Sequence, residues 1–247
     1  DDSFTFSTAA IMAGDSIVGG LGENSITLTT DAQTVTDANF ANVDEVQSLT
    51  LANGANSVTL DSNADATGVA TVYGGAGNSN YTQGTNFDNA LTLVGGVGND
   101  NITVQTNVQL LANSLVGGGG SDTILGAGGD DTISVGGNGG QPFQTTVDGG
   151  SGSNSLSISY TAITKLSDFP VRTMDSAGAL TLGDASGGVF VIKNIDLRAG
   201  KLSVAGRSYD FVDPLPSCNC RGRSNMHDGS LGSTQGVAIH PASGEVV

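Results

Sequence analysis

The sequence predicts an all-β fold, a right-handed parallel β-solenoid (a β-roll or β-helix) that ends in a small β-rich C-terminal cap. Glycine-rich loops recur at near-constant spacing, and short stretches of alternating apolar residues precede and follow them. Composition agrees, because 38 of the 247 residues are glycine, aromatic residues make up 5% and tryptophan is absent. A solenoid needs no thick core, since each turn buries its apolar face against its neighbours.

The spacing of the loops predicts the length of one turn. The loops begin at positions 53, 74, 95 and 117, and the interval from 126 to 149 continues this series after the doubled loop. One turn is therefore expected to hold about 21–23 residues, with parallel strands stacked about 4.8 Å apart. Leu91–Val94 and Ile102–Val104, on either side of the loop at Gly95, are examples of the expected strands.

The first interval, from the loop at Gly19 to the loop at Asn53, is clearly longer than one turn. We expect the surplus to leave the stack as a lateral loop within Thr29–Glu45, a polar stretch without glycine. Phe40 could pack back onto the stack from this loop.

Three loops fit one nine-residue template, G-G-x-G-x-D-x-(apolar)-x, with alanine at the second position of the last. They are Gly95–Thr103, Gly117–Leu125 and Gly126–Ser134. Their glycines and aspartates are the candidate site residues: Gly95, Gly96, Gly98, Asp100, Gly117, Gly118, Gly120, Asp122, Gly126, Gly129 and Asp131.

This template resembles the RTX (haemolysin-type) calcium-binding repeat. The resemblance implies that the first six residues form a turn that binds Ca²⁺ through the Asp carboxylate and loop carbonyls. The last three residues then form a short strand with an inward apolar side chain. The residue types suit this chemistry, because Ca²⁺ takes six to eight oxygen ligands and glycine lets the backbone curl until carbonyls converge.

Degenerate copies keep the glycines and replace the aspartate. Asn24 stands at the carboxylate position of the loop at Gly19, Ser79 in the loop at Gly74 and Asn154 in the loop at Gly149. A weaker copy spans Ala52–Val58. We expect these loops to keep the turn and to lose the ion.

The spacing of the aspartates predicts their places. Asp100 and Asp122 are separated by one turn length, so they should stack on the same edge and share an ion. Asp131 follows Asp122 after less than half a turn, so these two should lie on opposite edges.

Charge is distributed unevenly. All eight Lys and Arg residues follow residue 164, whereas sixteen of the 24 acids precede it, so residues 1–164 carry the whole net charge of −16. Such a field disfavours nucleic acid and anionic membranes as partners and favours divalent cations. Solubility in a salty extracellular medium is the alternative explanation.

The C-terminal part differs in composition. We expect residues 1–157 to form the solenoid and 158–212 a β-rich cap, with strands within 187–195 and 201–212 and a hairpin at Gly206. A cap would cover the apolar cross-section and open strand edge of the last turn. Residues 213–247 are expected to be a linker or extended tail, through which copies could form a homo-oligomer or filament.

The tail holds Cys218 and Cys220, whose separation would strain a disulfide between them. They are expected to be free, paired between chains or part of a site completed elsewhere, and a metal site with His227 is a further alternative.

The sequence contains no H-E-x-x-H, no G-x-S-x-G followed by a histidine partner and no G-x-x-x-x-G-K-[ST], so we expect no enzyme. No apolar stretch approaches the length of a membrane span. The favoured hypothesis is a non-catalytic calcium-binding structural module of a secreted or cell-surface protein, such as a stalk, adhesin, surface layer or filament. The alternative is the C-terminal RTX module of a secreted hydrolase whose catalytic domain lies outside this chain. Ice binding is weaker, because no regular T-x-T ladder repeats at the turn period.

Overall fold

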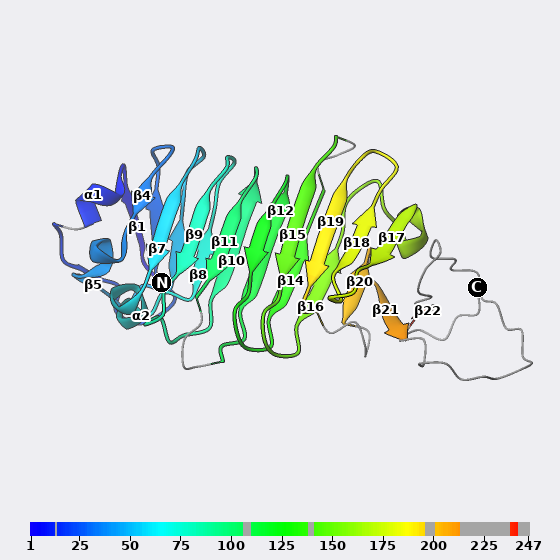
Figure 1. The fold of residues 1–247 in the computed structure, drawn as a ribbon. Coiled ribbons are helices and arrows are strands. Elements are labelled where there is room, and N and C mark those ends of the chain that lie inside the picture. Colours follow the sequence, from blue (N-terminus) through cyan, green and yellow to red (C-terminus); the bar gives the residue numbers. More distant parts are fainter. Residues whose placement is uncertain (13, 106–109, 138–140, 196–200, 213–237, 242–247) are drawn as a thin grey trace, which may run out of the picture.

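The structure, a computed structural model, describes residues 1–12, 14–105, 110–137, 141–195, 201–212 and 238–241. Figure 1 shows an elongated stack of parallel coils, which confirms the predicted β-solenoid. Helical structure in the described part is limited to α1 (Ala9–Met12), α2 (Ser62–Thr67) and the 3₁₀ turns η1 (Asp37–Phe40) and η2 (Leu166–Asp168). No helix in these ranges is long and apolar enough to cross a membrane.

The strands form two long sheets. In spatial order sheet 1 contains β1 (Ser3–Phe6), β3 (Ser25–Leu28), β6 (Ser48–Thr50), β8 (Thr71–Tyr73), β10 (Thr92–Val97), β12 (Ser114–Gly119), β14 (Thr132–Val135), β16 (Ser155–Ile158), β20 (Leu202–Val204), β21 (Arg207–Val212) and β22 (Ala238–Pro241). Sheet 2 contains β17 (Val171–Met174), β18 (Leu180–Gly183), β19 (Val189–Lys193), β15 (Gln144–Asp148), β13 (Thr123–Leu125), β11 (Asn101–Val104), β9 (Asn80–Gln83), β7 (Ser57–Leu60) and β4 (Thr34–Val35). The chain passes from one sheet to the other twice in each regular turn.

The strand register gives the turn length directly. Ile26 pairs with Leu49, and Leu93 pairs with Leu115, at intervals that match the predicted turn length. The turn from Ser114 to Thr132 is shorter, and the register of β12 against β14 shifts after Val116. The last turn is much longer, because Leu156 of β16 pairs with Leu202 of β20.

The interior is a column of apolar side chains, to which most strands of the two sheets contribute one or two. On sheet 1 one residue of each successive strand pairs in register with the next, and each is at most 2% exposed: Ile26, Leu49, Val72, Leu93, Leu115, Ile133, Leu156 and Leu202. On sheet 2 Ile102, Ile124 and Val147 form the matching column. Burying each such side chain contributes about 1.5–3 kcal/mol relative to exposure.

The predicted lateral loop within Thr29–Glu45 is wrong. The segment supplies β4, which pairs with β7, and β5 (Val43–Asp44), which pairs with β2 (Ile17–Val18). The loop at Gly19 precedes a strand of sheet 1 and the loop at Asn53 precedes a strand of sheet 2. The interval between them is therefore one and a half ordinary turns, with no surplus chain.

The C-terminal end is more elaborate than the other turns. Parallel pairing continues past residue 157, because β15 pairs with β19 and β16 with β20. Between β16 and β19 the chain leaves the coil and adds β17 and β18, and β18 pairs antiparallel with β17 on one side and with β19 on the other. Phe190 lies at the centre of an aromatic cluster with Phe143, Tyr160 and Phe169.

The predicted hairpin is present, with β20 and β21 antiparallel on either side of Ala205 and Gly206. Both turn residues have positive φ, 49° and 77°, as tight hairpins of right-handed twist require. From the predicted tail, β22 pairs with β21. Cys218, Cys220 and His227 lie outside the described residues.

Candidate cation-binding loops

The three template loops lie at the two edges where the sheets meet. The loops at Gly95 and Gly117 lead from sheet 1 to sheet 2, which we call edge 1, and the loop at Gly126 leads back from sheet 2 to sheet 1 at edge 2. Asp100 and Asp122 therefore stack one turn apart on edge 1, and Asp131 lies on edge 2. This confirms the register predicted from the spacing.

All three carboxylates point into the solenoid. Asp100, Asp122 and Asp131 are 2%, 0% and 1% exposed. Side chains two residues apart in an extended chain share a face, so each aspartate points inward with the apolar residue two positions later, as Asp100 does with Ile102.

One oxygen of each carboxylate joins adjacent turns. The backbone N–H of Ser79 donates to Oδ1 of Asp100 at 2.9 Å, and that of Asp100 donates to Oδ1 of Asp122 at 3.0 Å. On edge 2 the N–H of Asn113 donates to Oδ1 of Asp131 at 2.8 Å. Each aspartate thus accepts a hydrogen bond from the equivalent residue of the preceding turn.

The degenerate loops use their asparagines in the same way. The N–H of Asp2 donates to Oδ1 of Asn24 at 2.7 Å, and the N–H of Asp131 donates to Oδ1 of Asn154 at 2.9 Å. Asn56 and Asn113 accept from Gln33 and Leu91 at the same place in their turns. Sequence reasoning missed the role of Asn56 and Asn113, although an Asn or Asp recurring just before an inward apolar residue is a usable signal.

The second polar atom separates the asparagine loops from the aspartate loops. Nδ2 of Asn24 donates to the carbonyls of Gly20 and Glu45 at 3.0 and 2.8 Å, and Nδ2 of Asn154 donates to the carbonyl of Asn194 at 2.9 Å. In contrast, Oδ2 of Asp100, Asp122 and Asp131 is buried with no hydrogen-bond partner. In these asparagine loops the side-chain amide therefore donates to main-chain carbonyls, whereas an aspartate has no such donor.

The first glycine of each template creates the space around Oδ2. A Cβ at Gly95 would lie 2.6 Å from Oδ2 of Asp100 and 2.8 Å from the carbonyl oxygen of Gly117. At Gly126 a Cβ would lie 2.5 Å from Oδ2 of Asp131 and 2.8 Å from the carbonyl oxygen of Gly149. The carboxylate oxygen and a carbonyl of the next turn therefore face the same small cradle, with no proton donor between them.

Burial changes the acidity of these groups. Desolvation raises the pKa of Asp100 to about 6, and the neighbouring Asp122 carboxylate adds to the effect. Desolvation likewise raises the pKa of Asp131 to about 6 and raises that of Asp122. At neutral pH Asp100 and Asp131 are still mainly ionised, so a buried negative charge faces carbonyl oxygens.

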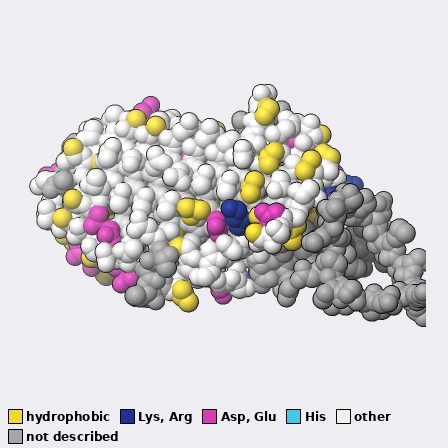
Figure 2. All heavy atoms as spheres, viewed as in Figure 1, with side chains coloured by type: hydrophobic (Ala, Val, Ile, Leu, Met, Phe, Trp, Pro, Cys, Tyr) yellow, Lys and Arg dark blue, Asp and Glu magenta, His cyan; other side chains and the backbone are white. Residues whose placement is uncertain are grey.

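The donor set consists of oxygen atoms alone. No group of three or more His, Cys, Asp or Glu side chains in the described ranges is arranged to hold a metal ion, so a cation here would be held by one or two carboxylates and by main-chain carbonyls. Hard cations such as Ca²⁺ prefer oxygen ligands of this kind. Acidic side chains also gather over the N-terminal turns in Figure 2, whereas the few Lys and Arg side chains lie toward the C-terminal half.

Comparison with models of known families, with curated proteins and with solved structures finds no match.

Proposed function

We propose that this chain is a non-catalytic, calcium-binding structural module of a secreted or cell-surface protein, such as a stalk, adhesin, surface layer or filament. One observation carries the proposal. Oδ2 of Asp100, Asp122 and Asp131 is buried and unpartnered at the position where Asn24 and Asn154 place a donating amide.

A bound cation would compensate the buried charge of each aspartate loop. An unpartnered buried charge costs several kcal/mol, which is why buried charges in proteins are paired or bound to metals. The asparagine loops avoid this cost with an N–H group. The aspartate loops would avoid it with a cation that the Asp carboxylate and the carbonyls of adjacent turns bind together.

The resemblance to the RTX repeat supports Ca²⁺ as that cation and an extracellular or cell-surface location. The glycine pattern also agrees with the local geometry, since Gly96 and Gly118 have φ values of 108° and 92°, a region that favours glycine. An extended stack of parallel strands suits a spacer or a filament component, because each turn contacts only its neighbours.

Calorimetric titration of the calcium-free protein with Ca²⁺ at pH 7.5 tests the proposal. The matched variant is Asp100→Asn/Asp122→Asn/Asp131→Asn, which keeps every Oδ1 acceptor and adds the missing amide. We expect the natural sequence to bind Ca²⁺ and the variant to stay folded by circular dichroism without binding it. No heat of binding to the natural sequence, or equal binding by the variant, would contradict the proposal.

A further inference from the structure

The outward face of sheet 1 carries a continuous row of hydroxyl groups. One hydroxyl side chain per strand pairs in register from β1 to β16: Ser3, Ser25, Ser48, Thr71, Thr92, Ser114, Thr132 and Ser155. At about 4.8 Å per strand the row is about 34 Å long. The row is not evident in the sequence, because serine and threonine occupy this position in no regular order from turn to turn.

Most of these hydroxyls are available to a ligand. Among the described residues, only Ser155 and Thr132 of the row form a side-chain hydrogen bond, in which the Ser155 hydroxyl donates to that of Thr132 at 3.4 Å and also contacts the Asp131 carbonyl. Each remaining member lies outward, directly before an inward apolar residue, on a strand whose backbone is already paired. Their donors and acceptors are therefore not needed to hold the fold.

A short apolar strip lies beside the middle of this row. Tyr73, Val94 and Val116 pair in register on three successive strands, two positions after Thr71, Thr92 and Ser114. Tyr73 is 47% exposed. Threonines flank the strip on the N-terminal side and serines on the C-terminal side, at positions 27, 50, 134 and 157.

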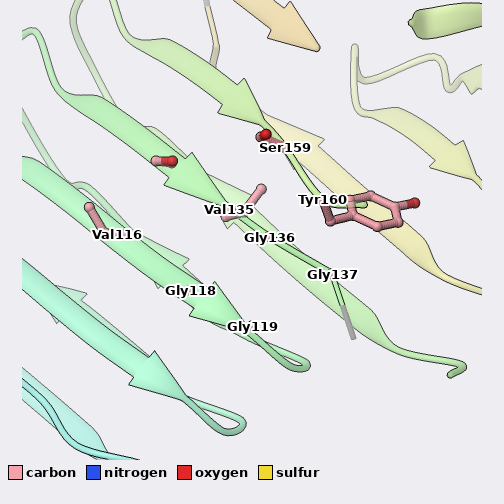
Figure 3. A pocket seen from close by; sticks show the side chains of 9 residues that line it. Val116, Gly118, Gly119, Val135, Gly136, Gly137, Ser159 and Tyr160 are labelled. Carbon is pink, nitrogen blue, oxygen red and sulfur yellow. The ribbon is translucent and has the colours of Figure 1, made fainter. Parts of the chain in front are cut away.

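The strip ends at a shallow groove of about 320 Å³ lined by Val116, Ser134, Ser159 and Tyr160 and by glycines 118, 119, 136 and 137. Figure 3 shows the Tyr160 side chain and the backbone segments that contain the lining glycines. A Cβ at Gly137 would lie 2.7 Å from the Tyr160 ring, so glycine is required there for the ring to lie against the backbone. The Tyr160 hydroxyl donates to Asp184 at 2.6 Å, which fixes the ring's orientation.

The face is uncharged on a strongly acidic chain. None of the nine parallel strands of sheet 1, from β1 to β20, contains a charged residue, although the chain carries a net charge of −16. The parallel strands of sheet 2 differ, since β15 ends at Asp148 and β19 at Lys193. Charge complementarity on sheet 1 therefore favours an uncharged ligand rich in hydroxyl groups.

We propose that this face binds a linear, uncharged polysaccharide that lies along the solenoid axis. Sugar rings present hydroxyls at their edges and C–H groups on their faces. The hydroxyl row would exchange hydrogen bonds with the edges, while Tyr73, Val94 and Val116 would pack against the faces. Because the face repeats with each turn, weak contacts with successive sugars would add along the chain. The proposal does not depend on calcium in the edge loops.

Co-sedimentation with microcrystalline cellulose and with chitin, at saturating Ca²⁺, tests this surface. Thr92→Glu places a carboxylate in the hydroxyl row, and Tyr73→Ser removes the ring. Thr103→Glu is the matched control, because Thr103 points outward from β11 on sheet 2. We expect the natural sequence and Thr103→Glu to sediment with at least one polysaccharide, and Thr92→Glu and Tyr73→Ser to bind at least tenfold more weakly.

Circular dichroism would establish that each variant is folded. Three results would overturn the proposal: no sedimentation of the natural sequence with either polysaccharide, equal loss in Thr103→Glu, or thermal hysteresis in ice without polysaccharide binding. The last result would assign the hydroxyl row to ordered water.

Discussion

The backbone N–H of Asp100 donates to Oδ1 of Asp122, the equivalent residue one turn further on, at 3.0 Å, while Oδ2 of Asp122 is buried without a partner. The same side chain thus stabilises the stack through one oxygen and leaves a buried negative charge on the other. Where asparagine replaces aspartate, both side-chain atoms are satisfied, as in Asn24. This difference between the two side chains leads to the first two predictions.

Asn154→Asp should convert a closed loop into one that needs a cation. The substitution replaces the amide that donates to Asn194 with a carboxylate oxygen that faces the same carbonyl. At pH 7.5 in chelator we expect a loss of about 1–3 kcal/mol in the free energy of unfolding, measured by urea denaturation, and recovery on adding Ca²⁺. Asn78→Asp is the control. Asn78 is exposed, and its Oδ1 accepts a hydrogen bond from the backbone N–H of Asn99, which a carboxylate can also accept. Equal loss in both variants would contradict the account.

In chelator, the natural protein should lose stability as pH rises. A salt-bridged carboxylate has the opposite effect, because its contribution is lost as pH falls. The folded-state pKa of Asp100 and Asp131 is raised from 3.8 to about 6, so the folded state binds these protons more tightly than the unfolded state. Their contribution is fully present below pH 3.8 and is lost as pH rises through about 6. The melting temperature of the natural protein, relative to that of the triple asparagine variant, should therefore fall as pH rises across this window. A difference that stays constant with pH would contradict the assigned burial.

Gln83→Leu should stabilise the protein. Gln83 lies in β9, only 1% exposed, with both polar side-chain atoms buried and unpartnered, and it pairs in register with Leu60 and Val104. Leucine would extend the apolar column and remove a desolvation cost of about 1–3 kcal/mol. Chemical denaturation should show a gain, whereas Gln105→Leu at an exposed position should show little change. A large loss in Gln83→Leu would mean that the amide has a structural role.

Phe190→Ala should strongly destabilise the C-terminal end. Phe190 is fully buried, and its ring lies 5.0 Å from that of Phe143 and 6.0 Å from those of Tyr160 and Phe169. Truncating a buried phenylalanine costs about 3–5 kcal/mol. Hydrogen exchange should show lost protection in β18 and β19 before the central turns, while Val171→Ala, at an exposed position, should leave the pattern unchanged. Uniform loss along the whole stack would contradict a locally packed end.

The sequence predicted the fold, the turn length and the relative places of Asp100, Asp122 and Asp131, because glycine loops and alternating strands repeat at fixed intervals. It did not predict which edge each loop occupies. The loops at Gly19 and Asn53 have related patterns, but they lie half a turn out of phase, so an ordinary one-and-a-half-turn interval was interpreted as an insertion.

Two further features could not be predicted because they depend on register. The unpartnered Oδ2 atoms become evident only when the next turn's carbonyls are placed beside them. The hydroxyl row likewise requires the pairing of Ser3 through Ser155, since no single strand shows it. The strands β17 and β18 interrupt the period, and no repeat in the sequence marks where the coil resumes at β19.

Thermal unfolding at pH 7.5 tests whether Ca²⁺ binds to the aspartate loops. The natural protein and Asp100→Asn/Asp122→Asn/Asp131→Asn are each measured with saturating Ca²⁺ and with chelator. Ligand linkage stabilises by about 2.7 kcal/mol per site at a free concentration of 100 times Kd. We predict that the melting temperature of the natural protein rises with Ca²⁺. The melting temperature of the variant should be independent of Ca²⁺ and at least as high as that of the natural protein in chelator. Equal melting temperatures of the natural protein in Ca²⁺ and in chelator would contradict a cation at the aspartate loops.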